Sequence, residues 1–230
     1  MAEVPQHVRK FLFRSCESRN SASSECLEVL IPEVVSPSYG MYTWPCAPVL
    51  AQYVWYHRHD FPKRNVLELG AGTALPGIVA AKCGANVILS DSGQLPKCLQ
   101  NCEVSCQANG MVGSVAVVGI TWGLFTPELL DLGPIDIILG SDCFYDPAVF
   151  EDILVTVSFL LEHNPHAQFV CSYQERASDW SLEHLLHKWN LSCTQLPLAT
   201  FDADIPNIAD SNLPGSHTVH VFQITRTTRS

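Results

Sequence analysis

From Asn65 onward, short apolar segments alternate with longer segments whose apolar residues recur every three or four positions. Segments such as VLEL, VILS and QFVCSY are almost continuously apolar, as expected for strands of a sheet that is covered on both faces. Right-handed crossovers join the strands of such a sheet. The pattern therefore predicts an α/β fold with a doubly wound sheet, with strands at 66–70, 86–90, 115–120, 135–140 and 167–173 and helices near 74–83, 93–109, 147–162 and 177–188.

Two further strand-like segments follow the last predicted helix. LSCTQLPL starts at Leu191 and HTVHVFQITR starts at His217, so they predict a C-terminal antiparallel hairpin. The connection between them, residues 199–216, contains no basic residue and three aspartates. Connections of this length inside a compact domain are usually functional or disordered.

The N-terminal part of the chain has a different composition. Residues 1–25 are rich in Ser, Arg and Asn and are predicted to form a mobile arm, which leaves one folded domain at 26–230. The segment CLEVLIPEVV that opens this domain is predicted to form an extended hairpin arm. Trp44 and Pro45 then precede an amphipathic helix, so Trp44 is either a core aromatic or a lid over a ligand at the helix mouth.

A glycine turn connects the first predicted strand of the sheet to its helix. Gly70 and Gly72 flank Ala71, and glycine can adopt a positive φ and let the backbone approach a ligand closely. Asp91 ends the next strand, twenty-one residues after Gly70. At that spacing a carboxylate can accept both hydroxyls of a ribose. The pair of features predicts a nucleoside site.

Two details favour S-adenosylmethionine over a dinucleotide. The helix opens with GAGTALPG, which departs from the G-x-G-x-x-G pattern of pyrophosphate sites. Glu68 directly precedes the turn, where a carboxylate would repel phosphate and attract a cationic sulfonium or amino group. The alternative is a tight turn of the kind found in any α/β protein.

The distribution of charge bears on the partner. The net charge is −10, and the segment from Cys98 to Glu175 holds ten acidic residues with no Lys or Arg. Nucleic-acid binding is disfavoured because phosphates need a basic surface. A basic protein segment would be attracted, although ordinary solvated acidic helices would produce the same composition.

Other features exclude several classes of protein. No apolar stretch is long enough to span a membrane, and the N-terminus has no signal-peptide core, so we expect a cytoplasmic and nuclear protein. The ten cysteines are expected to be reduced thiols, and no C-x-x-C pair suggests a metal. Cys98, Cys102 and Cys106 recur every four residues and are expected to form a small apolar helix face.

The fourth strand of the sheet ends in Ser141, Asp142 and, three residues later, Tyr145. Its carboxyl end should lie beside the glycine turn, because ligands of open α/β sheets bind where the strand order reverses. Asp142 and Tyr145 would then flank the transferred group, and Trp122 would close the adenine side. The alternatives are a core position for Trp122, a helix cap for Asp142 and a helix-start anchor for Tyr145.

Together these motifs resemble the seven-strand protein methyltransferases of the methyltransferase family 16 group, from about residue 26 to 225. The resemblance implies a Rossmann-like class I methyltransferase sheet and S-adenosylmethionine as the methyl donor. It also implies a donor site formed by Trp44, the Gly70–Gly72 turn, Asp91, Trp122 and the backbone at Ser141. Two departures from the group pattern, Ser141 in place of alanine and Ala74 in place of glycine, remove no required group.

The resemblance further implies that Asp142 and Tyr145 face the acceptor. The nearest part of the group points to an arginine of a histone tail, and the wider group points to lysine. We expect Asp142 to orient the cationic nitrogen and the Tyr145 ring to contact it by a cation–π interaction. An arginine acceptor calls for a second carboxylate, for which Asp146 and Glu175 are candidates. A small-molecule or nucleic-acid methyltransferase and a non-catalytic cofactor-binding protein are the competing hypotheses.

Overall fold

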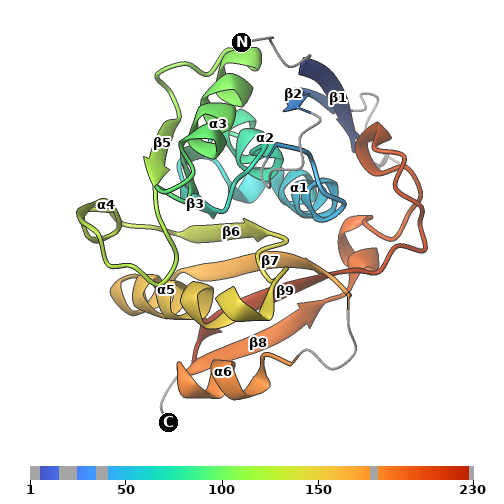
Figure 1. The fold of residues 1–230 in the computed structure, drawn as a ribbon. Helices are drawn as coiled ribbons and strands as arrows, with labels where there is room; N and C mark the ends of the chain where they lie inside the picture. The colour runs from blue at the N-terminus through green and yellow to red at the C-terminus, as the bar shows by residue number, and fades with distance from the viewer. Residues whose placement is uncertain (1–5, 16–24, 35–40, 177–180, 228–230) are drawn as a thin grey trace.

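The computed structural model describes residues 6–15, 25–34, 41–176 and 181–227. Its centre is a seven-stranded sheet with the strand order β5-β4-β3-β6-β7-β9-β8 (Figure 1). The strands are β3 (Asn65–Leu69), β4 (Asn86–Asp91), β5 (Ala116–Gly119), β6 (Ile137–Ser141), β7 (Gln168–Gln174), β8 (Leu191–Leu196) and β9 (Val219–Arg226). The α/β class and the seven-stranded, doubly wound sheet are thus confirmed.

The direction of the strands also follows the prediction. β3 pairs in parallel with β4 and β6, β4 with β5, and β6 with β7. β9 runs antiparallel between β7 and β8, which confirms the C-terminal hairpin. Because the chain winds outward from β3 to β5 and then continues at β6, the strand order reverses between β3 and β6. Ligands of open α/β sheets bind at this point.

Helices cover both faces of the sheet. They are α1 (Cys46–Tyr56), α2 (Leu75–Lys82), α3 (Pro96–Ala108), α4 (Pro127–Leu130), α5 (Phe150–His163) and α6 (Glu183–Lys188), with short 3-10 turns η1 (Arg58–Asp60), η2 (Pro147–Val149), η3 (Leu198–Phe201) and η4 (Ile208–Asp210). The first three helices pack on one face of the sheet, and α5 and α6 pack on the other (Figure 1). Part of the helix predicted at 177–188 lies outside the described residues. Among those described, no helix is long and apolar enough to cross a membrane.

Alternation along β3 assigns its side chains to the two faces. Val66 belongs to the core beneath α1 and α2, whereas Leu67 and Leu69 belong to the core beneath α5. Glu68 therefore points toward the α2 face, because successive strand residues point to opposite faces. Cys102 and Cys106 of α3 lie in the α2-side core, as the small apolar helix face predicted.

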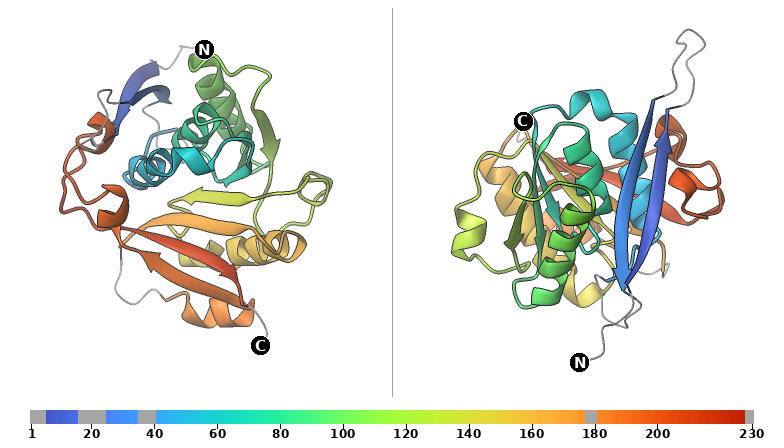
Figure 2. Two further views of the ribbon diagram at one scale, coloured as in Figure 1. Left: turned by 180° about the vertical axis from the view of Figure 1, so that it is seen from behind. Right: turned by 90° about the horizontal axis from the view of Figure 1, so that it is seen from above.

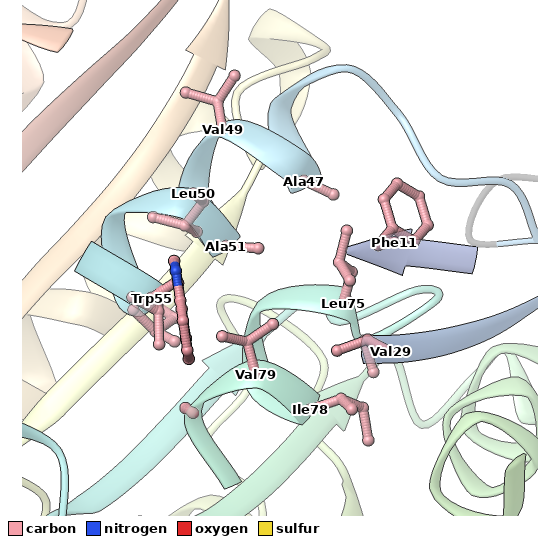
Figure 3. Close-up of a cluster of buried hydrophobic side chains, with 14 of the residues drawn as sticks. Phe11, Val29, Ala47, Val49, Leu50, Ala51, Trp55, Leu75, Ile78 and Val79 are labelled. Atoms are coloured by element: carbon pink, nitrogen blue, oxygen red, sulfur yellow. The ribbon is translucent and has the colours of Figure 1, made fainter. Parts of the chain in front are cut away.

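The N-terminal segment is not a mobile arm over its whole length. β1 (Gln6–Arg14) pairs antiparallel with β2 (Cys26–Val34), and Phe11 and Phe13 are completely buried. Figure 3 shows Phe11 and Val29 from this hairpin beside Leu75 and Ile78 of α2. The hairpin therefore belongs to the folded domain, and the predicted boundary at residue 25 is wrong. Residues 1–5 and 16–24 lie outside the described residues.

The connection at 199–216 is folded against this hairpin (Figure 2, right). Arg14 donates to both carboxylate oxygens of Asp210 at 3.0 Å, and Arg9 donates to the Ser211 carbonyl. Phe201 and Ile208 of the connection are themselves buried in the core beneath it. It is therefore an ordered cover on the domain, held in part by residues that the sequence assigned to a mobile arm.

Candidate functional site

The turn after β3 has the backbone that its glycines predict. Gly70 has φ +62° and Gly72 has φ +54°, and the Ala71 N–H donates to the Ser90 carbonyl of β4 at 2.8 Å. A Cβ on Gly70 would lie 2.7 Å from Cζ2 of Trp122. Such a distance is too short for a side chain, so Gly70 lets the indole lie directly across the turn.

Asp91 is held next to this turn at the end of β4. Its Oδ2 accepts the Gly72 N–H at 2.9 Å, and its Oδ1 accepts the Ser92 N–H at 2.8 Å. Burial raises the pKa of Asp91, and these two hydrogen bonds act in the opposite direction. Each carboxylate oxygen has a second lone pair, so Asp91 can still accept the two hydroxyls of a ribose. The geometry fits a nucleoside.

Glu68 does not occupy the place that we expected. Its side chain is fully buried on the α2 side of the sheet and is absent from the pocket wall. Oε2 accepts the Gly77 N–H of α2 at 2.9 Å, and burial raises the pKa of the carboxyl to about 8. The interpretation that Glu68 faces a sulfonium is therefore corrected: Glu68 joins β3 to the first turn of α2, and its burial favours the protonated form of the carboxyl.

A pocket of about 400 Å³ opens at the carboxyl ends of β3, β4 and β6. This volume lies in the range of small-molecule sites. The other nine residues predicted for the site all line it: Trp44, Gly70, Ala71, Gly72, Asp91, Trp122, Ser141, Asp142 and Tyr145. The structure thus brings together residues that are up to about a hundred positions apart in the chain, while their contacts with a cofactor stay a prediction.

Aromatic rings border this pocket on two sides. Trp44 is 43% exposed, so it is not a core residue, and its ring lies 6.0 Å from that of Tyr42 in a T-shaped arrangement. Trp122 lies 6.4 Å from Tyr145, with the two rings tilted by 50°. Aromatic faces of this kind can stack on an adenine or contact a cation. Sequence reasoning missed Tyr42, although its position two residues before Trp44 was a usable signal.

Asp142 lies at the end of β6 in a left-handed backbone conformation, with φ +56°. Its N–H donates to the Ser172 carbonyl of β7 at 2.9 Å. The side chain does not cap the following helix, because Asp146 accepts the Ala148 N–H there at 2.9 Å. Aspartate adopts this conformation more readily than most residues other than glycine, and Asp202 and Asp210 share it. The helix-cap alternative for Asp142 is therefore wrong.

Arg176 covers the Asp142 carboxylate. Its Nη1 donates to Oδ1 at 2.8 Å and its Nη2 donates to Oδ2 at 2.6 Å, so the pair is bidentate. The side chain of Asp142 is 7% exposed and that of Arg176 is 29% exposed. The hydrogen bond to Asp142 raises the pKa of Arg176. Nothing in the sequence links these two residues, because the ion pair depends on the adjacency of β6 and β7.

Neither predicted candidate for a second carboxylate lies in the pocket wall. Asp146 caps η2, and Glu175 is 3.5 Å from His220 at the start of β9. Asp152, in the first turn of α5, lines the pocket instead. Among the described residues, no group of three or more His, Cys, Asp or Glu side chains is arranged to hold a metal ion.

The acidic segment from 98 to 175 is partly neutralised by basic residues from outside it. Arg64 lies 3.4 Å from Asp136, and Arg226 lies 3.0 Å from Glu162. Lys188 pairs in the same way with Glu151. The negative field over this part of the protein is therefore weaker than the sequence alone implied.

Comparison with known proteins identifies the chain's relatives. The profile of the lysine methyltransferase family matches residues 23–186. The chain is 59% identical to histone-arginine methyltransferase METTL23 of Xenopus laevis, over 96% of this chain and 92% of that protein. It is 32% identical to protein N-lysine methyltransferase METTL21A of Danio rerio, over 64% of this chain and 67% of that protein.

Solved structures share the fold at low sequence identity. Magnesium protoporphyrin IX methyltransferase from Synechocystis, solved with bound S-adenosylmethionine, superposes with a TM-score of 0.52 and 16% identity, covering 79% of each chain. Such a likeness shows the fold alone. The family match and the high identity to its members, in contrast, extend over most of the domain that carries the pocket. This chain therefore belongs to the lysine methyltransferase family, whose members are S-adenosylmethionine-dependent protein methyltransferases.

Proposed function

We propose that this protein methylates an arginine of a basic protein segment, with a histone tail as the favoured acceptor. The observation that carries the proposal is the Asp142 carboxylate at the end of the pocket, which binds the guanidinium of Arg176 through both oxygens. A carboxylate in this geometry matches the planar fork of arginine. The 59% identity to a protein named histone-arginine methyltransferase supports the same acceptor.

The residues of the pocket divide into a donor side and an acceptor side. The donor supplies a methyl group on a positively charged sulfur, so the transfer is an in-line displacement in which alignment lowers much of the barrier. Gly70 and Asp91 hold the nucleoside, and Trp44 and Trp122 exclude water from it. Asp142 accepts N–H bonds from the acceptor guanidinium and fixes its orientation relative to the methyl group.

As the nitrogen–carbon bond forms, the sulfur–methyl bond of the donor breaks and the sulfur keeps its electron pair. The acceptor nitrogen must also release a proton, which the exposed Asp152 carboxylate in the pocket wall accepts and passes to solvent. Arginine is protonated in water, with a pKa above about 12. Asp142 stabilises the positive charge that the guanidinium carries as the nitrogen–carbon bond forms, and the Tyr145 ring contacts the cation from one face. Asp152 is the further carboxylate in the pocket wall and adds negative potential.

Two alternative functions compete with this proposal. A lysine acceptor is favoured by the description of the family and by the relative named protein N-lysine methyltransferase METTL21A. A non-catalytic cofactor-binding protein would need the donor side alone. The acidic net charge of −10 disfavours direct binding of nucleic acid. If the acceptor is a histone, methyl transfer takes place in the nucleus. Other basic proteins would be acceptors in the cytoplasm.

The test uses isotopically labelled S-adenosylmethionine with purified histones and with a cell extract, followed by mass-spectrometric mapping of the labelled sites. Label on arginine supports the proposal, and label on lysine alone supports the first alternative. Binding of S-adenosylhomocysteine without any transfer supports the second. Asp91→Ala serves as the control, because loss of the ribose contact should reduce transfer to any acceptor.

A further inference from the structure

We propose that Arg176 is an internal competitor for the acceptor carboxylate and thereby lowers the apparent affinity for every acceptor cation. This inference rests on the proposed role of Asp142 in binding the acceptor. Both residues line the pocket, Asp142 at the end of β6 and Arg176 two residues after β7. Their ion pair therefore lies at the place where the acceptor must enter.

The ion pair leaves little room for a second cation. Each carboxylate oxygen of Asp142 accepts one N–H of Arg176, and 7% of the Asp142 side chain is exposed. The rest of the side chain is covered by the protein, and the Asp142 charge adds to the burial that raises the pKa of the Cys46 thiol. An incoming guanidinium can reach both oxygens only when Arg176 moves away. Arg176 is 29% exposed, so it borders the solvent into which it would move.

The exchange has different consequences for the two possible acceptors. When an acceptor arginine replaces Arg176, one bidentate pair is lost and an equivalent one is formed, so the number of charged hydrogen bonds is conserved. A lysine ammonium is a compact charge that does not match both oxygens in the same planar geometry. Lysine therefore replaces two well-aligned bonds by a poorer contact. The preference for arginine thus comes from the Asp142 carboxylate, and Arg176 lowers the apparent affinity for both acceptors by the same factor.

The backbone arrangement agrees with this role. Arg176 Nη1 also donates to the Gln174 carbonyl at 3.2 Å, so the guanidinium has a second anchor beside β7. Asp142 is held independently by its N–H bond to Ser172 and its left-handed backbone. The carboxylate can thus keep its position while the guanidinium exchanges.

The experiment compares two peptides that are identical except for a single arginine or lysine at the target position of a histone-tail sequence. In Arg176→Met, the Michaelis constant for the arginine peptide should fall by about tenfold, the equivalent of one charge-assisted hydrogen bond. The ratio of kcat/KM for arginine over lysine should stay unchanged, because Arg176 must leave the carboxylate before either acceptor binds. The effect should fall on KM more than on kcat, because Arg176 competes with binding.

The chain offers a matched control. Arg14 also forms a bidentate pair, with Asp210 at 3.0 Å, and this pair lies on the hairpin outside the pocket wall. Arg14→Met removes the same charge and the same kind of ion pair, so the Michaelis constant for the arginine peptide should not change. Arg176→Lys keeps a cation beside Asp142 and should lower this Michaelis constant less than Arg176→Met does. It also provides a folded comparison if Arg176→Met is unstable in thermal melting.

Several outcomes would overturn the inference. An unchanged Michaelis constant for the arginine peptide in Arg176→Met would mean that the ion pair only ties β7 to β6. A higher Michaelis constant for the arginine peptide would mean that Arg176 assists binding. A loss of S-adenosylhomocysteine affinity in calorimetry would mean that Arg176 contacts the cofactor.

Failure of the proposed function would give a different result, since the wild-type protein would then methylate neither peptide or the lysine peptide alone. If neither peptide is methylated, the competition is measured directly by calorimetric binding of N-acetylarginine amide. This probe should bind about tenfold more tightly to Arg176→Met than to the wild type if Arg176 blocks the carboxylate. Equal affinity would refute the inference.

Discussion

Replacing Glu68 by glutamine should remove one pH-dependent contribution to stability. The Glu68 side chain is fully buried, and burial raises its pKa from the ordinary 4.5 to about 8 against the opposing Gly77 hydrogen bond. In the unfolded chain the same carboxyl ionises near its ordinary value. Between these two pH values, the folded protein holds a proton that the unfolded chain has released.

The sign of the effect follows from this difference in bound protons. The folded-state pKa is the higher one, so the stability contribution is fully present below pH 4.5 and falls as the pH rises to about 8. A difference of 8 − 4.5, or about 3.5 units, corresponds to about 5 kcal/mol over the whole range. Between about pH 5.5 and 7.5, the free energy of unfolding is expected to fall by about 3 kcal/mol from this group.

Glutamine has no proton to release, and its side-chain oxygen can still accept the Gly77 N–H. The free energy of unfolding should therefore be measured in urea for the wild type and for Glu68→Gln across this pH range. From the lower to the higher pH, the value for the wild type should fall by about 3 kcal/mol relative to the value for the variant. Glu103→Gln, at an exposed position of α3, is the control and should follow the wild type. Parallel pH profiles for the wild type and Glu68→Gln would refute the reasoning.

The same variant tests the corrected role of Glu68 in the site. Because Glu68 lies outside the pocket wall, Glu68→Gln should leave the affinity for S-adenosylhomocysteine within about threefold, less than one charged hydrogen bond. A loss above about tenfold, measured by calorimetry at pH 7, would restore the original interpretation that this carboxylate attracts the sulfonium.

Four further predictions concern the pocket and its surroundings. Asp91→Ala should weaken S-adenosylhomocysteine binding by about 1.5–3 kcal/mol through lost hydrogen bonds, and unchanged calorimetric affinity would contradict the nucleoside assignment. Gly70→Ala should cost about 1–2 kcal/mol of stability in urea unfolding from its φ of +62° alone, and more from displacing the indole above it. Tyr145→Ala should lower kcat/KM for a basic peptide more than Tyr145→Phe does, since phenylalanine keeps the aromatic face; equal losses would exclude a cation–π role. The Michaelis constant for that peptide should rise with salt concentration, and replacing Asp202 and Asp204 by lysine should raise it at low salt. If the Michaelis constant responds to neither change, the acidic surface has no role in binding the acceptor.

The repeating pattern of the chain was sufficient to predict the sheet. Strands buried on both faces need continuous apolar segments, and the turn between β3 and α2 needs small residues, so both features are visible locally. Asp91 could be predicted for the same reason, because its distance along the chain from Gly70 reflects one strand–helix–strand unit. The alternation within β3 also contained the correct face for Glu68, since Val66 and Glu68 share a side of the strand.

The first strand of the N-terminal hairpin, β1, was missed because composition outweighed pattern. Phe11 and Phe13 share one face of the strand and Leu12 lies on the other, so the segment KFLFR is locally apolar. The surrounding Ser, Arg and Asn residues nevertheless suggested an arm. The burial of these rings depends on α1 and α2, which lie far away in the sequence.

The acceptor end of the site was decided only by the tertiary structure. Asp142 and Arg176 are 34 residues apart, and they meet because β6 and β7 are parallel neighbours whose carboxyl ends lie at the same edge of the sheet. Asp152 enters the pocket from α5, whereas Asp146 and Glu175, which looked equivalent in the sequence, bind other partners. Local periodicity determines which face a side chain occupies, but the partner of a charge depends on strand order and register, which arise only when the whole chain packs.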